Sequence, residues 1–132
     1  MNLVSVRLIT ADVDRLVAFY QHATGLTADR PTPDFAELRT PAGTLAIGSV
    51  RTVPLFAPGA AEPAANRSAI VEFLVEDVDL LAAQLAAAGT TPVSGPATLP
   101  WGNRSLLVRD PDGNLVNFFA PVTPAARARL AR

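Results

Sequence analysis

Two stretches of the chain share the same order of apolar and polar positions. Each begins with an apolar run, residues 3–10 and 69–75, that predicts a strand. An aspartate follows each run, Asp12 or Asp77, and predicts the N-cap of a helix. The helical apolar positions are Val13, Leu16, Val17 and Tyr20, and then Val78, Leu81, Leu85 and Ala88, and each helix is expected to end at a glycine, Gly25 or Gly89.

Three shorter strand patterns follow each predicted helix. Tight turns at 41–43 and 111–113, which carry Pro and Gly, join the last two strands of each set. The pattern therefore predicts two copies of a strand, helix and three-strand unit. The predicted short strands are residues 26–29, 35–40 and 44–49, and residues 91–94, 104–109 and 115–120.

The two copies are also related in amino-acid identity. Residues 5–16 and 70–81 match at Val6, Asp12, Val13, Asp14 and Leu16, and residues 39–48 match 109–118 through Arg, Pro, Gly and Leu. The offset grows from 65 to 70, so we place the additional residues of the second copy around 100–104. Because there are only two copies, this is a duplicated half-domain rather than a repeat array.

The chain is expected to form a single domain, residues 1–132. The segment between the copies is rich in Pro and Ala and predicts a surface linker, in which Leu55 and Phe56 either pack locally or cover a pocket. The tail either forms a short arginine-bearing helix or frays. The expected boundaries are module one 3–49, linker 50–68, module two 69–121 and tail 122–132.

Composition narrows the possible functions. The chain has 132 residues, 49% of them hydrophobic, and no cysteine, which excludes disulfides, thiolate metal sites and a cysteine nucleophile. Its 11 basic residues are all arginine and are interleaved with 12 acidic residues, so a nucleic-acid partner is not expected. No apolar run approaches the roughly 20 residues that span a membrane. Without a signal-peptide pattern at the N-terminus, we expect a cytoplasmic protein.

The duplicated unit resembles the vicinal oxygen chelate superfamily, which includes glyoxalase I, extradiol dioxygenases, fosfomycin-resistance enzymes and bleomycin-resistance proteins. The motifs that carry the resemblance are DVDRLVAFY at 12–20, Gly25, PWGNR at 100–104 and DPDGNLVNF at 110–118. The resemblance implies an α+β fold in which two βαβββ modules form curved mixed sheets around a cleft. It also implies a homodimer.

Metal-dependent members of that superfamily carry a histidine near the start of each module's first strand and a glutamate in its last strand. Carried over by the motifs, the histidine positions fall on Ser5 and Ile70, and the glutamate positions fall on Ile47 and Asn117. None of these side chains is a good ligand for a divalent transition metal. His22, the single histidine, is expected at the surface of the first helix. We therefore expect no metal and no cofactor.

Strand alternation predicts which side chains line the cleft. Ser5, Arg7 and Ile9 alternate with a wholly apolar set that should pack beneath the helix. By the same alternation, the predicted inward side chains are Phe35, Glu37 and Arg39; Leu45, Ile47 and Ser49; Ile70, Glu72 and Leu74; Ser105, Leu107 and Arg109; and Leu115, Asn117 and Phe119. The expected ligand-binding residues are Ser5, Arg7, Glu37, Ile47, Ile70, Glu72, Trp101, Leu107, Asn117 and Phe119.

Several of these residues have two interpretations. Arg7 and Glu72 occupy equivalent positions with opposite charge, so they form either a structural ion pair or a ligand-recognition pair. Arg39 and Arg109 precede turns and are expected to brace them or lie in solvent rather than to clamp an anion. Trp101 either stacks on an aromatic ligand or anchors its loop.

The leading functional hypothesis is a metal-free protein that binds a small organic ligand, as in sequestration or antibiotic resistance. The alternative is a metal-independent enzyme of the isomerase, epimerase or lyase type. In that enzyme Glu72, or with less support Glu37, acts as general base while Arg7 and Asn117 stabilise negative charge. A weaker hypothesis is a loosely held hard cation between Glu37 and Glu72.

Overall fold

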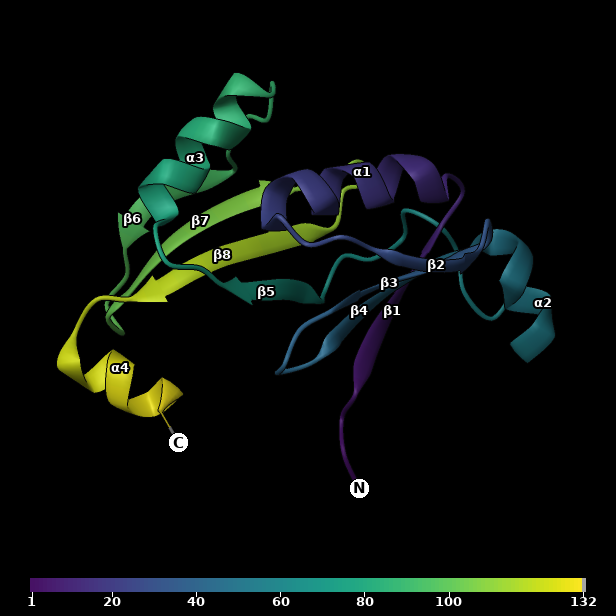
Figure 1. The fold of residues 1–132 in the computed structure, drawn as a ribbon, viewed down its shortest axis with the longest axis horizontal. Coiled ribbons are helices and arrows are strands. Elements are labelled where there is room, and N and C mark those ends of the chain that lie inside the picture. The colour runs from purple at the N-terminus through teal and green to yellow at the C-terminus, as the bar shows by residue number, and fades with distance from the viewer. Residues whose placement is uncertain (132) are drawn as a thin grey trace. The chain divides into compact units, whose positions relative to one another are not determined.

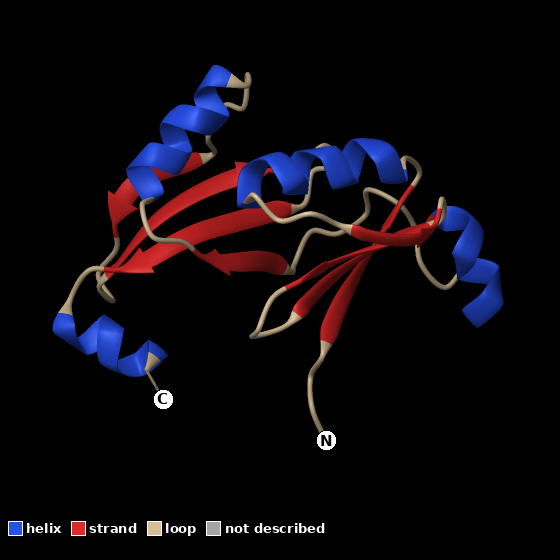
Figure 2. Cartoon of the chain, viewed as in Figure 1, coloured by secondary structure: helices blue, strands red, loops and turns tan. Residues whose placement is uncertain are grey.

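The computed structural model describes residues 1–131 and contains two four-stranded mixed sheets with associated helices (Figures 1 and 2). This architecture confirms the predicted α+β class. The chain separates into two compact units, each described by itself below. Unit 1 comprises Met1–Asn66 together with residues 110–113, and unit 2 comprises Arg67–Arg109 and the chain from Asn114 onward. Within residues 1–131, no helix is both long enough and apolar enough to cross a bilayer.

Unit 1 follows the predicted strand, helix and three-strand order. Its sheet has the order β1-β4-β3-β2, with β1 parallel to β4 and the other pairs antiparallel. The Asp12 carboxylate caps α1 by accepting the Arg15 N–H, and Gly25 ends it with a φ of 73°, as predicted. The elements are β1 (Ser5–Thr10), α1 (Val13–Thr24), β2 (Asp29–Thr32), β3 (Phe35–Arg39), β4 (Thr44–Ser49), η1 (Val50–Thr52) and α2 (Val53–Phe56).

Unit 2 repeats this arrangement with the sheet order β5-β8-β7-β6. Asp77 caps its helix by accepting the Leu80 N–H. The tail forms a helix rather than a frayed end, because the Thr123 hydroxyl accepts the Ala126 N–H and Ala126 is buried. The elements are β5 (Ile70–Leu74), α3 (Val78–Ala87), β6 (Ser94–Thr98), β7 (Asn103–Arg109), β8 (Leu115–Pro121) and α4 (Pro124–Leu130).

The two edge strands lie further along the chain than the pattern predicts. β2 covers Asp29–Thr32 instead of 26–29, and β6 covers Ser94–Thr98 instead of 91–94. Both strands are mostly exposed and polar, so no buried face marks their position in the sequence. Their limits are set by hydrogen bonding to the neighbouring strands β3 and β7.

Side chains of sheet 1 divide between two faces with different composition. Leu8, Ile47 and Ala36 pair across β1, β4 and β3 and belong to the buried core on one face. Arg7, Ala46 and Glu37 form the adjacent row on the other face. We call that second face the mixed face of sheet 1, and its residues are Ser5, Arg7, Ile9, Phe35, Glu37, Arg39, Thr44, Ala46 and Gly48.

The prediction that Ile47 shares a face with Ser5 and Arg7 is wrong, as it is for its alternating neighbours Leu45 and Ser49. Ile47 is 0% exposed and pairs with Leu8 on the core face. The cause is the length of the β3–β4 connection. Arg39 pairs with Thr44 in unit 1, whereas Arg109 pairs with Leu115 in unit 2, so the first turn is one residue shorter. A one-residue slip moves every side chain of a strand to the opposite face.

The same pairing gives the correct equivalence between the two units. Leu107 corresponds to Glu37 with the predicted offset of 70, but in the last strand Asn117 corresponds to Ala46, an offset of 71. The position that the repeat assigned to Ile47 therefore belongs to Ala46. Alanine, like isoleucine, has no side-chain atom that can bind a metal. This position therefore offers no metal ligand whichever of the two residues occupies it.

In sheet 2, the predicted inward side chains do share one face. Leu107, Asn117 and Glu72 form one row, and Ser105, Phe119 and Leu74 form the next. The opposite face contributes Leu106, Val108, Val116 and Phe118 to the core. The mixed face of sheet 2 consists of Ile70, Glu72, Leu74, Asn103, Ser105, Leu107, Arg109, Leu115, Asn117 and Phe119.

A buried hydrogen bond in unit 1 involves the turn at residues 110–113. The Tyr20 hydroxyl donates to Asp110 Oδ2 at 2.7 Å, and both residues are buried. Asp110 Oδ1 also accepts the Asp112 N–H, which closes the turn. Burial, reinforced by the Asp110 carboxylate, raises the pKa of Tyr20 above its ordinary value.

We therefore expect alkaline pH to destabilise the protein through Tyr20. In the folded state the phenol stays protonated, whereas in the unfolded chain it ionises near pH 10, so the free energy of unfolding falls as pH rises above about 10. The protein has a single tyrosine, so near-ultraviolet absorbance of tyrosinate reports this residue alone. Denatured protein is the control and should titrate near the ordinary value. A folded protein that titrates at the same pH contradicts the expectation.

Two isoleucines test the assignment of faces. Ile47→Ala should lower the free energy of unfolding by about 2–5 kcal/mol, because it leaves a cavity in the core. Ile70→Ala should cost about 1 kcal/mol or less, because Ile70 is 50% exposed on the mixed face of sheet 2. Urea denaturation measures both changes. Equal losses would mean that Ile47 does not occupy the core face.

Candidate functional site

On the mixed face of sheet 1, Arg7 contacts two aromatic rings. Its Cζ is 4.7 Å from the Phe35 ring centroid and 5.1 Å from that of Phe56. Both distances are within the range of cation–π contacts. Phe35 comes from β3, and Phe56 comes from α2 in the segment after β4. The linker residue Phe56 therefore has a definite neighbour, which the Pro- and Ala-rich composition of its segment did not indicate.

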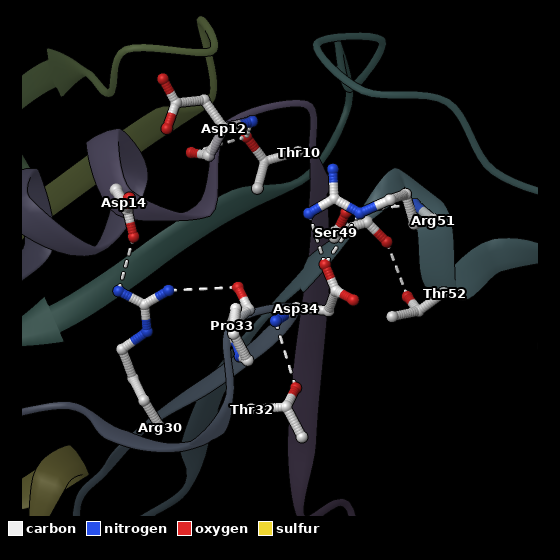
Figure 3. A network of polar contacts seen from close by, with 10 residues as sticks. All are labelled: Thr10, Asp12, Asp14, Arg30, Thr32, Pro33, Asp34, Ser49, Arg51 and Thr52. Carbon is white, nitrogen blue, oxygen red and sulfur yellow. Dashed lines mark hydrogen bonds and ion pairs between the residues drawn. The ribbon is translucent and has the colours of Figure 1, made fainter.

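A polar network fixes the segment that carries Phe56 (Figure 3). The Arg51 guanidinium binds Asp34 Oδ1 through Nε at 3.0 Å and Nη2 at 2.5 Å. The Ser49 hydroxyl accepts the Arg51 N–H, and the Thr52 hydroxyl donates to the Ser49 carbonyl at 2.7 Å. These contacts connect the turn between β2 and β3, the end of β4 and η1. The helix α2, which follows η1, therefore begins at a defined point beside the sheet.

Glu37 forms an ion pair with a neighbouring arginine, Arg39. Arg39 Nη2 lies 3.0 Å from Glu37 Oε1 and 3.3 Å from Asp29 Oδ2. The hydrogen bond to Glu37 raises the pKa of Arg39 further above its usual value. The Arg39 side chain therefore links β2 and β3 and does not bond to the turn at 41–43 that it was expected to brace, and the pairing leaves Glu37 less suited to act as a base or a metal ligand.

On the mixed face of sheet 2, Glu72 and Asn117 interact directly. They are cross-strand partners of β5 and β8, and Asn117 Nδ2 donates to Glu72 Oε2 at 2.8 Å. Glu72 is exposed, and its second carboxylate oxygen has no hydrogen bond within the described part of the chain. The possible ion pair between Arg7 and Glu72 stays a prediction, since these residues belong to different units.

Three oxygen atoms on the mixed face of sheet 2 are buried without a hydrogen-bond partner among residues 1–131. They are Asn103 Oδ1, Ser105 Oγ and Asn117 Oδ1. Ser105 is only 6% exposed, so water does not readily reach its hydroxyl. Buried polar atoms normally have partners, and an orphaned one costs about 1–3 kcal/mol. These oxygens are therefore candidates for contacts with a bound molecule.

The sequence contained a signal for part of this group. In β7, Asn103 and Ser105 are uncharged polar residues two positions apart, just before the apolar residues 106–108. That alternation places them on one face. Asn117 is among the expected ligand-binding residues, Ser105 is predicted only to face inward, and Asn103 is outside both predicted sets.

Trp101 lies in the loop between β6 and β7, and its side chain is 57% exposed. The loop is held through its main chain, because the Trp101 carbonyl accepts a hydrogen bond from Arg129 and the Val122 N–H donates to the Gly102 carbonyl. A Cβ at Gly102, where φ is +90°, would collide with Thr123 Oγ1. These main-chain contacts hold the loop, and contact of the Trp101 indole with a ligand stays a prediction.

The residues do not fit the divalent ion that the resemblance implies for metal-dependent members. The positions in question carry Ser5, Ala46, Ile70 and Asn117. In the described chain, no group of three or more His, Asp or Glu side chains is arranged to hold a metal ion. His22 lies exposed on α1, as predicted.

Comparisons with solved structures give the same fold. A protein from Nocardioides described as a glyoxalase/bleomycin resistance protein/dioxygenase matches with 26% identity and a TM-score of 0.75, covering 94% of this chain and 85% of that one. An enzyme from Burkholderia phytofirmans PsJN, described as belonging to the glyoxalase/bleomycin resistance protein/dioxygenase family, matches with 22% identity and a TM-score of 0.80, covering 92% of this chain and 100% of that one. A glyoxalase-related enzyme from Fulvimarina pelagi matches with 21% identity and a TM-score of 0.76, covering 94% of each chain.

Two comparisons of the sequence gave different results. No curated protein matches the chain. The model of one protein family does match, over residues 2–118, which is most of the chain and includes both sheets except the last residues of β8. This chain therefore belongs to the Glyoxalase/Bleomycin resistance protein/Dioxygenase superfamily.

Proposed function

We propose that this protein binds a small organic ligand on the mixed faces of its sheets without a divalent metal. The observation that carries the proposal is the set of orphaned oxygens of Asn103, Ser105 and Asn117. Amide oxygens accept hydrogen bonds, and a serine hydroxyl both accepts and donates. A ligand that carries N–H or O–H groups would satisfy these atoms and recover the free energy that their burial costs.

Apolar side chains around these oxygens support binding of an organic molecule. Phe119 and Leu74 lie in the same row as Ser105, and Leu107 lies in the same row as Asn117. Leu74 and Ile70 are exposed although they are large and apolar. A small number of fixed polar atoms within an apolar surface is typical of small-molecule sites, where apolar burial supplies affinity and polar atoms set orientation.

Binding without turnover would make the protein a sequestering protein, in keeping with the antibiotic-resistance members of its superfamily. A cytoplasmic location and a homodimer, in which two copies associate, belong to the same proposal. Both rest on the sequence and on the resemblance alone.

An enzymatic alternative rests on the hydrogen bond between Asn117 and Glu72. This contact orients the carboxylate and leaves Glu72 Oε1 available to a substrate. A carboxylate in that arrangement has the geometry of a general base, with Asn117 beside the reacting group. The reaction would be an isomerisation, epimerisation or lyase reaction that needs no metal.

Two buried hydroxyl groups, those of Ser105 and Thr10, test the ligand-binding proposal. Ser105→Ala should leave the free energy of unfolding unchanged or slightly higher, because it removes an orphaned hydroxyl, and yet it should weaken ligand binding by about fivefold or more. The matched control is Thr10→Val, which removes a satisfied buried hydroxyl on the core face of sheet 1 and should cost about 1–2 kcal/mol without affecting the ligand. The ligand comes from a thermal-shift screen of antibiotics, aromatic metabolites and small keto acids. Unchanged affinity of Ser105→Ala for every ligand found contradicts the proposal.

Glu72→Gln separates a binding protein from an enzyme. A sequestering protein should keep its affinity for ligand within about threefold, whereas an enzyme that uses Glu72 as base should lose turnover by about two to four orders of magnitude. Calorimetry and product analysis with the same ligands measure the two outcomes. Glu76→Gln, an exposed carboxylate just after β5, is the matched control and should change neither quantity.

A further inference from the structure

We propose that Arg7 is the binding site for an oxyanion of the ligand, a carboxylate or phosphate group attached to an organic body. This inference rests on the proposed function and specifies the chemistry of the molecule that is bound. It uses only the geometry of unit 1.

Arg7 differs from the other arginines of its unit in having no acceptor. Among the described residues, no carboxylate or carbonyl accepts a hydrogen bond from its guanidinium, and its contacts are the Phe35 and Phe56 rings. Each of the other four binds a carboxylate, and these four are Arg15, Arg30, Arg39 and Arg51. Within unit 1, Arg7 therefore keeps its charge and its N–H donors for a partner outside that unit, which we assign to a ligand oxyanion rather than to Glu72.

The strand next to Arg7 leaves room for its side chain. Gly48 pairs with Ile9 and with Phe35, and a Cβ at Gly48 would lie 3.6 Å from Arg7 Cδ. A methyl group would already be in van der Waals contact with the arginine stem, so a larger side chain would displace it. Ala46, which pairs with Arg7 itself, carries only a methyl group. The arginine can thus lie along the sheet and reach both rings.

The second ring is held in place by the polar network of Figure 3. Phe56 is 70% exposed, so this large apolar side chain does not belong to the core. Its helix α2 follows directly after the residues fixed by the Arg51–Asp34 ion pair. The ring is therefore kept beside Arg7 although little else covers it.

This arrangement favours an oxyanion over other ligands. Aromatic rings interact with the π-face of a guanidinium, and they leave the planar fork of N–H donors, which matches the two oxygens of a carboxylate or phosphate. The carboxylate of Glu37, on the same face, is already bound by Arg39 and does not neutralise Arg7. The two rings also offer apolar surface for the organic body.

The test is an NMR titration of the full-length ¹⁵N-labelled protein with benzoate, its neutral analogue benzamide, and inorganic phosphate. Benzoate should shift the Arg7 Nε–Hε resonance and bind about tenfold or more tightly than benzamide. Arg7→Gln should weaken benzoate binding by about tenfold or more, and Phe56→Leu by about threefold, because the second ring is lost. If phosphate competes with benzoate, the site accepts oxyanions in general. If phosphate does not compete, the site is specific for planar carboxylates.

Arg67→Gln is the matched control. It removes the same charge from an exposed arginine that has no partner in the described chain, so benzoate affinity should change by less than about twofold. Thermal unfolding establishes that each variant is folded, and the wild-type resonance shift is independent of any variant.

Two results overturn the inference. If benzoate and benzamide bind with equal affinity and Arg7→Gln binds both as the wild type does, the protein binds small molecules but Arg7 does not select an oxyanion. If neither benzoate nor phosphate shifts the Arg7 resonance at tens of millimolar, about the weakest binding of interest, Arg7 is not an anion site. In either case the Ser105 and Thr10 variants still test the proposed function separately.

Discussion

The parallel pairing of the first and last strands in each unit decides which side chains stand together on the mixed faces. Once β1 is in register with β4, Arg7 lies beside Ala46, and once β5 is in register with β8, Glu72 lies beside Asn117. The turn before the last strand sets this register, because a single residue more or less moves the whole strand to its opposite face. The unequal turns of the two units thus give the duplicated sequence two chemically different surfaces.

The two mixed faces offer complementary kinds of polar group. Sheet 1 presents a guanidinium held by two aromatic rings, which is a hydrogen-bond donor with a full charge. Sheet 2 presents a carboxylate oriented by Asn117 together with orphaned oxygens, which are mainly acceptors. In each case the polar atoms are set among apolar side chains and fixed by strand pairing, and the proposed recognition without a metal rests on these positions.

Much of this architecture was predictable from the sequence because the signals are local and occur twice. The caps Asp12 and Asp77 defined both helices, and alternation assigned the faces of β5, β7 and β8 correctly. The assignment failed at Ile47. The Pro and Gly of the two turns align in sequence, but the number of residues between the paired strands differs. Phe56 was not predicted as a partner of Arg7, since that contact depends on long-range ion pairing through Arg51. The orphaned oxygens required packing information that alternation alone does not contain.

The central claim is that fixed side chains, rather than a bound metal ion, recognise the ligand. The most direct measurement is the metal content of purified protein, determined by plasma mass spectrometry after exhaustive dialysis against metal-containing and then metal-free buffer. The account predicts that divalent metal remains far below one equivalent per chain while the protein still binds its ligand. A tightly retained stoichiometric divalent ion, with ligand binding lost when the ion is removed, would contradict it.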